Sequence, residues 1–118
     1  MILILLVISF FSYKRNRIDN ISFESNIWIN ENKIIRGNML DDLLSKNIIN
    51  NLNLDQIKEI LGEPDQIVTY HEENLDFFDI RYYLEQKYND DLYLSTLFSI
   101  RFDNENSIYL SHSIGLLK

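Results

Sequence analysis

The hydrophobic period of this sequence changes at Pro64, the only proline in the chain. Before it, apolar residues recur at steps of three and four, as in an amphipathic helix. After it, apolar and polar residues alternate in steps of two, as in a half-buried strand. With 118 residues, one domain is expected. Helices followed by consecutive strands predict the α+β class: a two-layer sandwich with two short helices on one face of an antiparallel sheet.

The stretch LNLDQIKEILGEPD, residues 52–65, carries this change. Asn53 suits the N-cap position, and Gln56 follows three residues later, as in a capping box. Gly62 suits the left-handed position after a helix, and Pro64 prevents the helix from resuming. We therefore expect a two-turn helix whose buried stripe comprises Leu54, Ile57, Ile60 and Leu61. Because so short a helix is marginal alone, we expect it to pack on the preceding helix as an αα-hairpin.

That preceding helix is predicted between Arg36 and Ile49, where one stripe contains Met39, Leu40, Leu43, Leu44 and Ile48. Asp41 and Asp42 are expected on its solvated side near the helix start. Neighbours on a helix diverge by about 100°, so this pair does not suit a metal ion or acid–base chemistry.

The strands are expected to form a meander of three or four. The first contains Ile67, Val68 and Tyr70, and the second covers residues 78–84. Residues 71–74 and 85–91 are predicted loops, and the third strand covers residues 92–102. After a turn at residues 103–106, a fourth strand contains Ile108 and Leu110 and extends toward His112.

The N-terminus is apolar from Met1 to Ile8 and again at Phe10 and Phe11. Roughly a dozen apolar residues match a signal-peptide hydrophobic region and fall short of the about 20 that span a membrane. We expect residues 1–13 to be a signal or membrane anchor, residues 14–33 a polar tether and residues 34–118 the domain. Alternatively, the run is a buried element of the domain itself. Trp28, with Ile27 and Ile29, is expected to form a short edge strand or a hydrophobic plug.

Charge and composition exclude several function classes. From Ile18 onward, the chain has eight basic and eighteen acidic residues. A domain with this negative net charge repels nucleic acid. Without cysteine, the chain forms no disulfide and has no thiol nucleophile or thiolate metal site. His71 and His112 lack any surrounding catalytic or metal-binding pattern, and there is no glycine-rich phosphate loop. We therefore expect no enzyme activity, metal, cofactor or small-molecule substrate, and a protein as partner.

The strands contain aromatic residues that could form a partner-binding surface, which we predict to be Tyr82, Tyr83, Tyr93 and Arg101. Tyrosine is enriched at binding hot spots. It is also favoured in strands for packing reasons alone. Both explanations of these tyrosines stay open.

The ordered set RGNMLDDLL, LNLDQIKEILGEPD, RYYL and IRFDNENSIYL, within residues 36–112, resembles the SmpA/OmlA (BamE-like) family of small cell-envelope proteins. Leu61, Gly62 and Pro64 match its helix stop, and Phe102 with Asp103 match its last turn. The lipoprotein cysteine frequent in that family is absent. The resemblance implies a non-enzymatic, extracytoplasmic module that binds proteins, as in outer-membrane assembly, or alternatively an inhibitor-type binding domain.

The side of the membrane stays open. Lys14, Arg15 and Arg17 follow the apolar run, and the positive-inside tendency would then leave the domain in the cytoplasm. A cytoplasmic-side, membrane-anchored interaction domain is therefore the second alternative.

Overall fold

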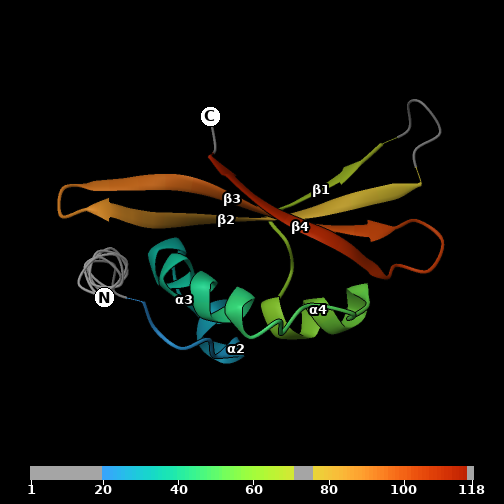
Figure 1. Cartoon of the computed structure of the whole chain (residues 1–118), viewed down its shortest axis with the longest axis horizontal. Helices are drawn as coiled ribbons and strands as arrows, with labels where there is room; N and C mark the ends of the chain where they lie inside the picture. Colours follow the sequence, from blue (N-terminus) through green and yellow to red (C-terminus); the bar gives the residue numbers. More distant parts are fainter. Residues whose placement is uncertain (1–19, 71–75, 117–118) are drawn as a thin grey trace, which may run out of the picture.

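The computed structural model describes residues 20–70 and 76–116, which fold into helices followed by a four-stranded antiparallel sheet (Figure 1). The strand order is β1-β2-β3-β4, so each strand pairs with its neighbour in sequence. The helices lie together on one face of the sheet (Figure 1), which confirms the predicted α+β sandwich. The elements are α2 (Ser25–Asn30), α3 (Lys33–Ser45), α4 (Leu54–Leu61), β1 (Gln66–Thr69), β2 (Phe77–Asn89), β3 (Leu92–Asp103) and β4 (Tyr109–Leu116).

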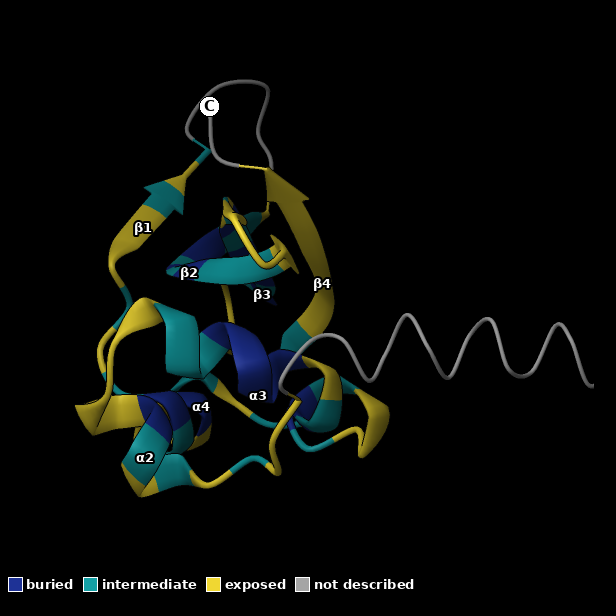
Figure 2. Cartoon of the chain, turned by 90° about the vertical axis from the view of Figure 1, so that its left-hand side faces the viewer, coloured by how far each residue is buried: buried dark blue, intermediate teal, exposed yellow. Residues whose placement is uncertain are grey.

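The core lies between the helices and the inner face of β2 and β3. Ile80, Tyr82 and Leu84 face inward from β2, and each is buried. They meet buried residues of β3, of the helices and of the segment after α3, which are Phe98, Ile100, Phe102, Trp28, Met39, Leu40, Leu43, Ile49, Ile57 and Leu61. Figure 2 shows the buried part of α3 directed toward the sheet. The alternation of side chains along β2 and β3 thus determines which of their residues lie in the core.

The capping motif of α4 forms as predicted. The Asn53 side chain accepts a hydrogen bond from the backbone N–H of Gln56 at 2.9 Å. The Gln56 side chain in turn accepts one from the backbone N–H of Asn53 at 3.0 Å. Gly62 ends the helix with a φ of 77°, a value at which glycine has no Cβ penalty.

The predicted αα-hairpin of α3 and α4 is wrong, because α4 packs mainly against α2. Ser25 at the start of α2 donates its hydroxyl to the carbonyl of Ile60 at 2.5 Å. Trp28 of α2 is fully buried in the core. It is therefore a hydrophobic plug, although on a helix and not on an edge strand, and the packed domain begins well before residue 34.

Helix α3 begins three residues earlier than Arg36 and ends at Ser45. Asn32 caps it by accepting hydrogen bonds from Ile34 N and Ile35 N, both at 3.0 Å. Asp42 was expected to be merely solvated. Instead it accepts a hydrogen bond from the backbone N–H of Phe23 at 2.7 Å and pairs with Lys46. The bond from Phe23, with a smaller contribution from Lys46, lowers the pKa of Asp42.

The predicted charged loop at residues 85–91 is also wrong, since β2 continues to Asn89. Glu85 pairs with Ser95 and Lys87 pairs with Tyr93 across the β2–β3 hairpin. Pairing with β3 stabilises these polar residues in a strand, although they do not show the alternation of apolar and polar residues that predicts one. The predicted loop at residues 71–74 and the predicted anchor at residues 1–13 lie outside the described residues.

Candidate interaction surface

No described helix covers the second face of the sheet (Figures 1 and 2). We call this second face the outer face. The rows that cross β2, β3 and β4 on it are Asp79–Arg101–Ser111, Arg81–Ser99–Ser113 and Tyr83–Leu97–Gly115. The pairs Glu85–Ser95 and Lys87–Tyr93 continue it along β2 and β3. Small residues on β4 leave the longer side chains of β2 and β3 as its most prominent features.

Asp79 and Arg101 lie on the outer face near the start of β2 and the end of β3. The guanidinium of Arg101 donates two hydrogen bonds to the Asp79 carboxylate, at 2.8 and 3.0 Å. The hydroxyl of Tyr70 donates a third, at 2.7 Å. This bidentate geometry fixes both side chains relative to the sheet.

The two partners differ in burial. Asp79 is only 4% exposed, whereas the Arg101 side chain is 38% exposed. Burial alone would raise the pKa of Asp79, but the hydrogen bonds from Arg101 and Tyr70 outweigh it and the net pKa is lowered. The same pairing raises the pKa of Arg101. The pair is therefore fully ionised at neutral pH, and Arg101 carries its charge at the surface.

Two aromatic rings hold the Arg101 guanidinium in place. It lies 3.9 Å from the centroid of the Phe77 ring and 5.5 Å from that of Tyr70. The two rings contact each other at 4.9 Å between centroids. Such cation–π contacts orient a charged group without neutralising it, so Arg101 is presented in one direction.

Tyr83 and Tyr93 lie farther along the same face. The Tyr83 hydroxyl donates to Gln66 at 3.1 Å, and the Lys33 ammonium lies 5.7 Å from the ring centroid. Tyr93 is exposed near the end of the β2–β3 hairpin, opposite Lys87. Both residues are accessible side chains on the outer face, as a partner-binding role requires.

Tyr82 does not belong to this surface, and its predicted place there is wrong. Its side chain is fully buried, with the ring edge against Trp28 at 6.2 Å between centroids. Its hydroxyl donates to the carbonyl of Gly62 at 2.8 Å. Burial raises the pKa of Tyr82, with the Glu63 charge acting in the same direction. The physical reason is parity, because alternate residues of a strand face opposite sides.

The sequence prediction also missed Phe77 and Asp79 as parts of this surface. A signal was present: an acid in the middle of an aromatic strand is unusual unless a partner neutralises it. Arg101 on the next long strand is such a partner. Their pairing depends on the register of the hairpin, which the sequence pattern alone does not specify.

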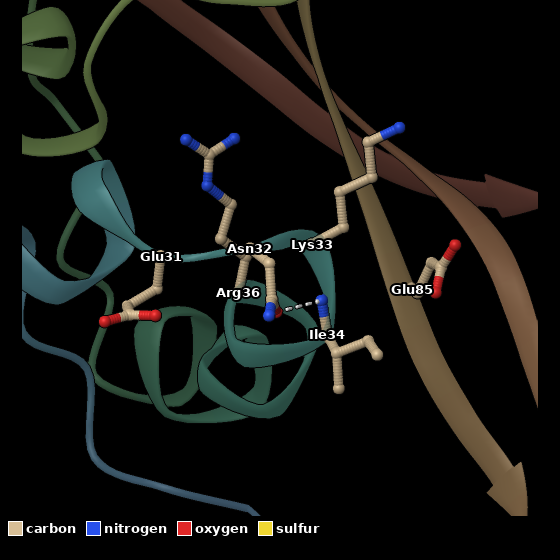
Figure 3. A pocket seen from close by; sticks show the side chains of 6 residues that line it. All are labelled: Glu31, Asn32, Lys33, Ile34, Arg36 and Glu85. Atoms are coloured by element: carbon tan, nitrogen blue, oxygen red, sulfur yellow. Dashed lines mark hydrogen bonds between the residues drawn. The ribbon is translucent and has the colours of Figure 1, made fainter.

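A separate polar recess of about 470 Å³ lies where α2 meets α3 beside β2 (Figure 3). Its lining residues are Glu31, Asn32, Lys33, Ile34, Arg36 and Glu85. Arg36 donates to the carbonyls of Trp28 at 2.7 Å and Ile29 at 3.4 Å. It thereby occupies carbonyls at the end of α2. Arg36 and the Asn32 cap thus serve the α2–α3 junction.

His112, the histidine within the described residues, contacts aromatic side chains. His112 Nδ1 lies 2.7 Å from the Tyr109 hydroxyl, and its ring contacts Phe98 at 6.1 Å between centroids. His71 lies outside the described residues. Among residues 20–70 and 76–116, no three potential ligands gather as a metal site would need.

Within the same residues, no helix combines the length and apolarity needed to cross a membrane. Comparisons of the chain with protein-family models, curated proteins and solved structures found no match.

Proposed function

We propose that this chain is a non-enzymatic cell-envelope module that binds a protein partner through the outer face of its sheet. Residues 1–13 attach it to the membrane or direct its export, and the folded domain lies outside the cytoplasm. The apolar N-terminus and the resemblance to SmpA/OmlA proteins support this location. No cofactor and no small-molecule substrate belong to this function.

The observation that carries the proposal is the state of Arg101. Its charge is partly exposed, while its geometry is fixed by Asp79 and by two aromatic rings. A cation whose position is already fixed loses little side-chain entropy when a partner binds. The half-buried Tyr70 lies beside it, and the exposed Tyr93 lies on the same face eight residues away along β3. Arg and Tyr are also the residue types that most often dominate binding energies. The part of the guanidinium that Asp79 does not engage thus gives an otherwise acidic domain a defined donor for a carboxylate of its partner.

Tyr93→Ala tests the binding surface. Tyr93 is exposed, so its truncation leaves the core intact. We expect recovery of the partner from detergent-solubilised envelopes to fall about tenfold, the effect of losing one hot-spot residue. Tyr88→Ala is the matched control, because Tyr88 is an exposed tyrosine of the same hairpin at its register shift. Equal recovery with both variants would overturn the proposal.

Location is tested with a single added thiol, since the chain has no cysteine. Lys118→Cys in intact cells should react with a membrane-impermeant maleimide if the domain is extracytoplasmic. Reaction only after lysis would instead support the alternative of a cytoplasmic-side, membrane-anchored interaction domain. That alternative is favoured by the basic residues Lys14, Arg15 and Arg17 directly after the apolar run.

A further inference from the structure

Strand β4 leaves one long edge of the sheet open. One edge of β4 pairs with β3 along the length of the strand. The other edge is occupied only at its start, where Tyr109 N donates to the carbonyl of Leu52 at 3.1 Å and Ile108 bridges Asn53. From Leu110 to Leu116, no described residue pairs with the outer edge.

This edge lacks the features by which proteins block unwanted strand pairing. Such features are charged residues, proline, short length or a covering element. The sequence of β4, YLSHSIGL, contains no Lys, Arg, Asp, Glu or Pro. Leu110, Ile114 and Leu116 are 51%, 47% and 63% exposed. On the opposite side of the sheet, β1 has only four residues, and the part of β2 beyond its pairing with β1 carries Glu85 and Lys87. Short length and charge both oppose strand pairing, so β4 is the edge better suited to accept another strand.

The distribution of charge favours a second copy of this chain as that strand. The last acidic residue is Glu105, and the remaining thirteen residues contain none. Two copies that meet at β4 therefore bring two neutral strands together and keep their carboxylates apart. The other three strands each carry or closely adjoin an acidic residue, namely Asp65, Asp79 and Asp103. Contact through them would bring like charges together.

We propose that β4 pairs antiparallel with β4 of a second copy, about a two-fold axis at Ser113. Ser113 is the midpoint of the open segment Leu110–Leu116. This register places Leu110 opposite Leu116 of the other copy, and His112 opposite Ile114. His112 and Ile114 both lie on the face of the sheet that the helices cover, since they pair with the buried residues Ile100 and Phe98. The edge is therefore complementary to itself, as a two-fold interface requires.

The product is a continuous eight-stranded sheet formed by two domains. A single pair of seven-residue edges buries less area than the roughly 1,200 Å² of a stable interface. The dimer is accordingly weak and depends on concentration, which attachment of both copies to one membrane would raise. Arg101 and Tyr93 take no part in it, so this inference stands apart from the proposed partner surface.

Disulfide trapping tests the pairing directly. In the full chain in detergent, Ser113→Cys places one thiol at the two-fold axis. Opposed residues of antiparallel strands have Cα atoms about 4.5–5.5 Å apart, a distance that suits a disulfide. Ser95→Cys on β3 and Ser45→Cys at the end of α3 are controls away from the axis. We expect Ser113→Cys to form dimers at least tenfold faster than either control.

Adding Ile114→Lys to Ser113→Cys should reduce dimer formation to the control rate, because an edge lysine opposes strand pairing. Circular dichroism verifies that each variant is folded. Equal rates for the three cysteine variants would show clustering through the N-terminus in micelles, and would overturn the proposal. So would trapping that is unaffected by Ile114→Lys.

A second measurement needs no cysteine. Sedimentation of the full chain in density-matched detergent should show a mass that rises toward that of two chains as concentration increases. The Ile114→Lys variant should keep the mass of one chain throughout. A wild-type chain that stays monomeric at several hundred micromolar would overturn the proposal independently of any trapping result.

Discussion

Arg101 and Asp79 form a bidentate ion pair across β2 and β3, on the face of the sheet opposite the helices. The pair links the register of the longest hairpin to the geometry of the proposed binding surface. Its carboxylate is buried while its guanidinium reaches water. The pair therefore has consequences both for stability and for the direction in which the Arg101 charge is presented.

Arg101→Ala should destabilise the domain by about 1–2 kcal/mol, because it leaves a buried carboxylate with fewer donors. The loss is smaller than the about 3–5 kcal/mol of a fully buried pair, since solvent already screens the guanidinium. Urea unfolding measures it. Lys46→Ala, which breaks the exposed pair with Asp42, is the matched control and should change stability far less, because solvent screens an exposed pair. Equal effects of the two variants would contradict the account.

Stability should also depend on pH through Asp79. Its pKa in the folded domain is below the ordinary value of 3.8, so the unfolded chain binds its proton first as pH falls. The contribution is fully present above about pH 5 and disappears as pH falls through the folded pKa. Asp79→Asn removes this ionisation. The difference in unfolding free energy between wild type and Asp79→Asn should therefore shrink between pH 5 and pH 2, and a constant difference would exclude the proposed role of the carboxylate.

Gly37→Ala should destabilise the domain because α3 approaches β2 closely at this point. A Cβ at residue 37 would collide with the backbone carbonyl oxygen of Glu85, which cannot move as a flexible side chain could. Overpacking of this kind costs about 1–3 kcal/mol. Gly115→Ala is the control, since nothing lies within 4 Å of the added methyl group. Thermal unfolding of both variants checks this, and a melting temperature unchanged by Gly37→Ala would show that the two elements are farther apart.

Tyr82→Phe should cost about 1 kcal/mol, because it leaves the carbonyl of Gly62 without the hydroxyl donor. Tyr83→Phe removes a hydroxyl bonded to the exposed Gln66 side chain, where water can replace it. Its effect on stability should be smaller by at least half. Chemical unfolding compares the two variants directly. A larger loss for Tyr83→Phe would mean that the two tyrosines have been assigned to the wrong faces.

The parts of the fold that sequence predicted well are those with local physical signals. The cap at Asn53 and the stop at Gly62 act within one or two turns of chain. The alternation from Thr96 to Phe102 marks a strand with one buried face, and Thr96, Phe98, Ile100 and Phe102 are buried. The predicted tether at residues 14–33 omits helix α2, because six residues are too few to display a helical period.

The surface was less accessible to prediction because it depends on pairing between strands. Tyr82 shares its parity with the buried Ile80 and Leu84, so its burial could have been inferred from the alternation. The contact between Asp79 and Arg101 could not be inferred in this way. The polar residues 85–89, which include Glu85 and Lys87, concealed the true length of β2 and therefore the register of the hairpin. A two-residue error in the turn would bring a different residue opposite Arg101.

Site-specific photo-crosslinking in intact cells tests the central claim most directly. A photoreactive amino acid replaces Tyr93 on the outer face in one variant and Glu59 on the exposed side of α4 in another. The account predicts one discrete crosslinked protein from position 93, its loss on adding Arg101→Ala, and none from position 59. The same crosslinked protein from position 59, or none from position 93 in a folded variant, would contradict binding through the outer face.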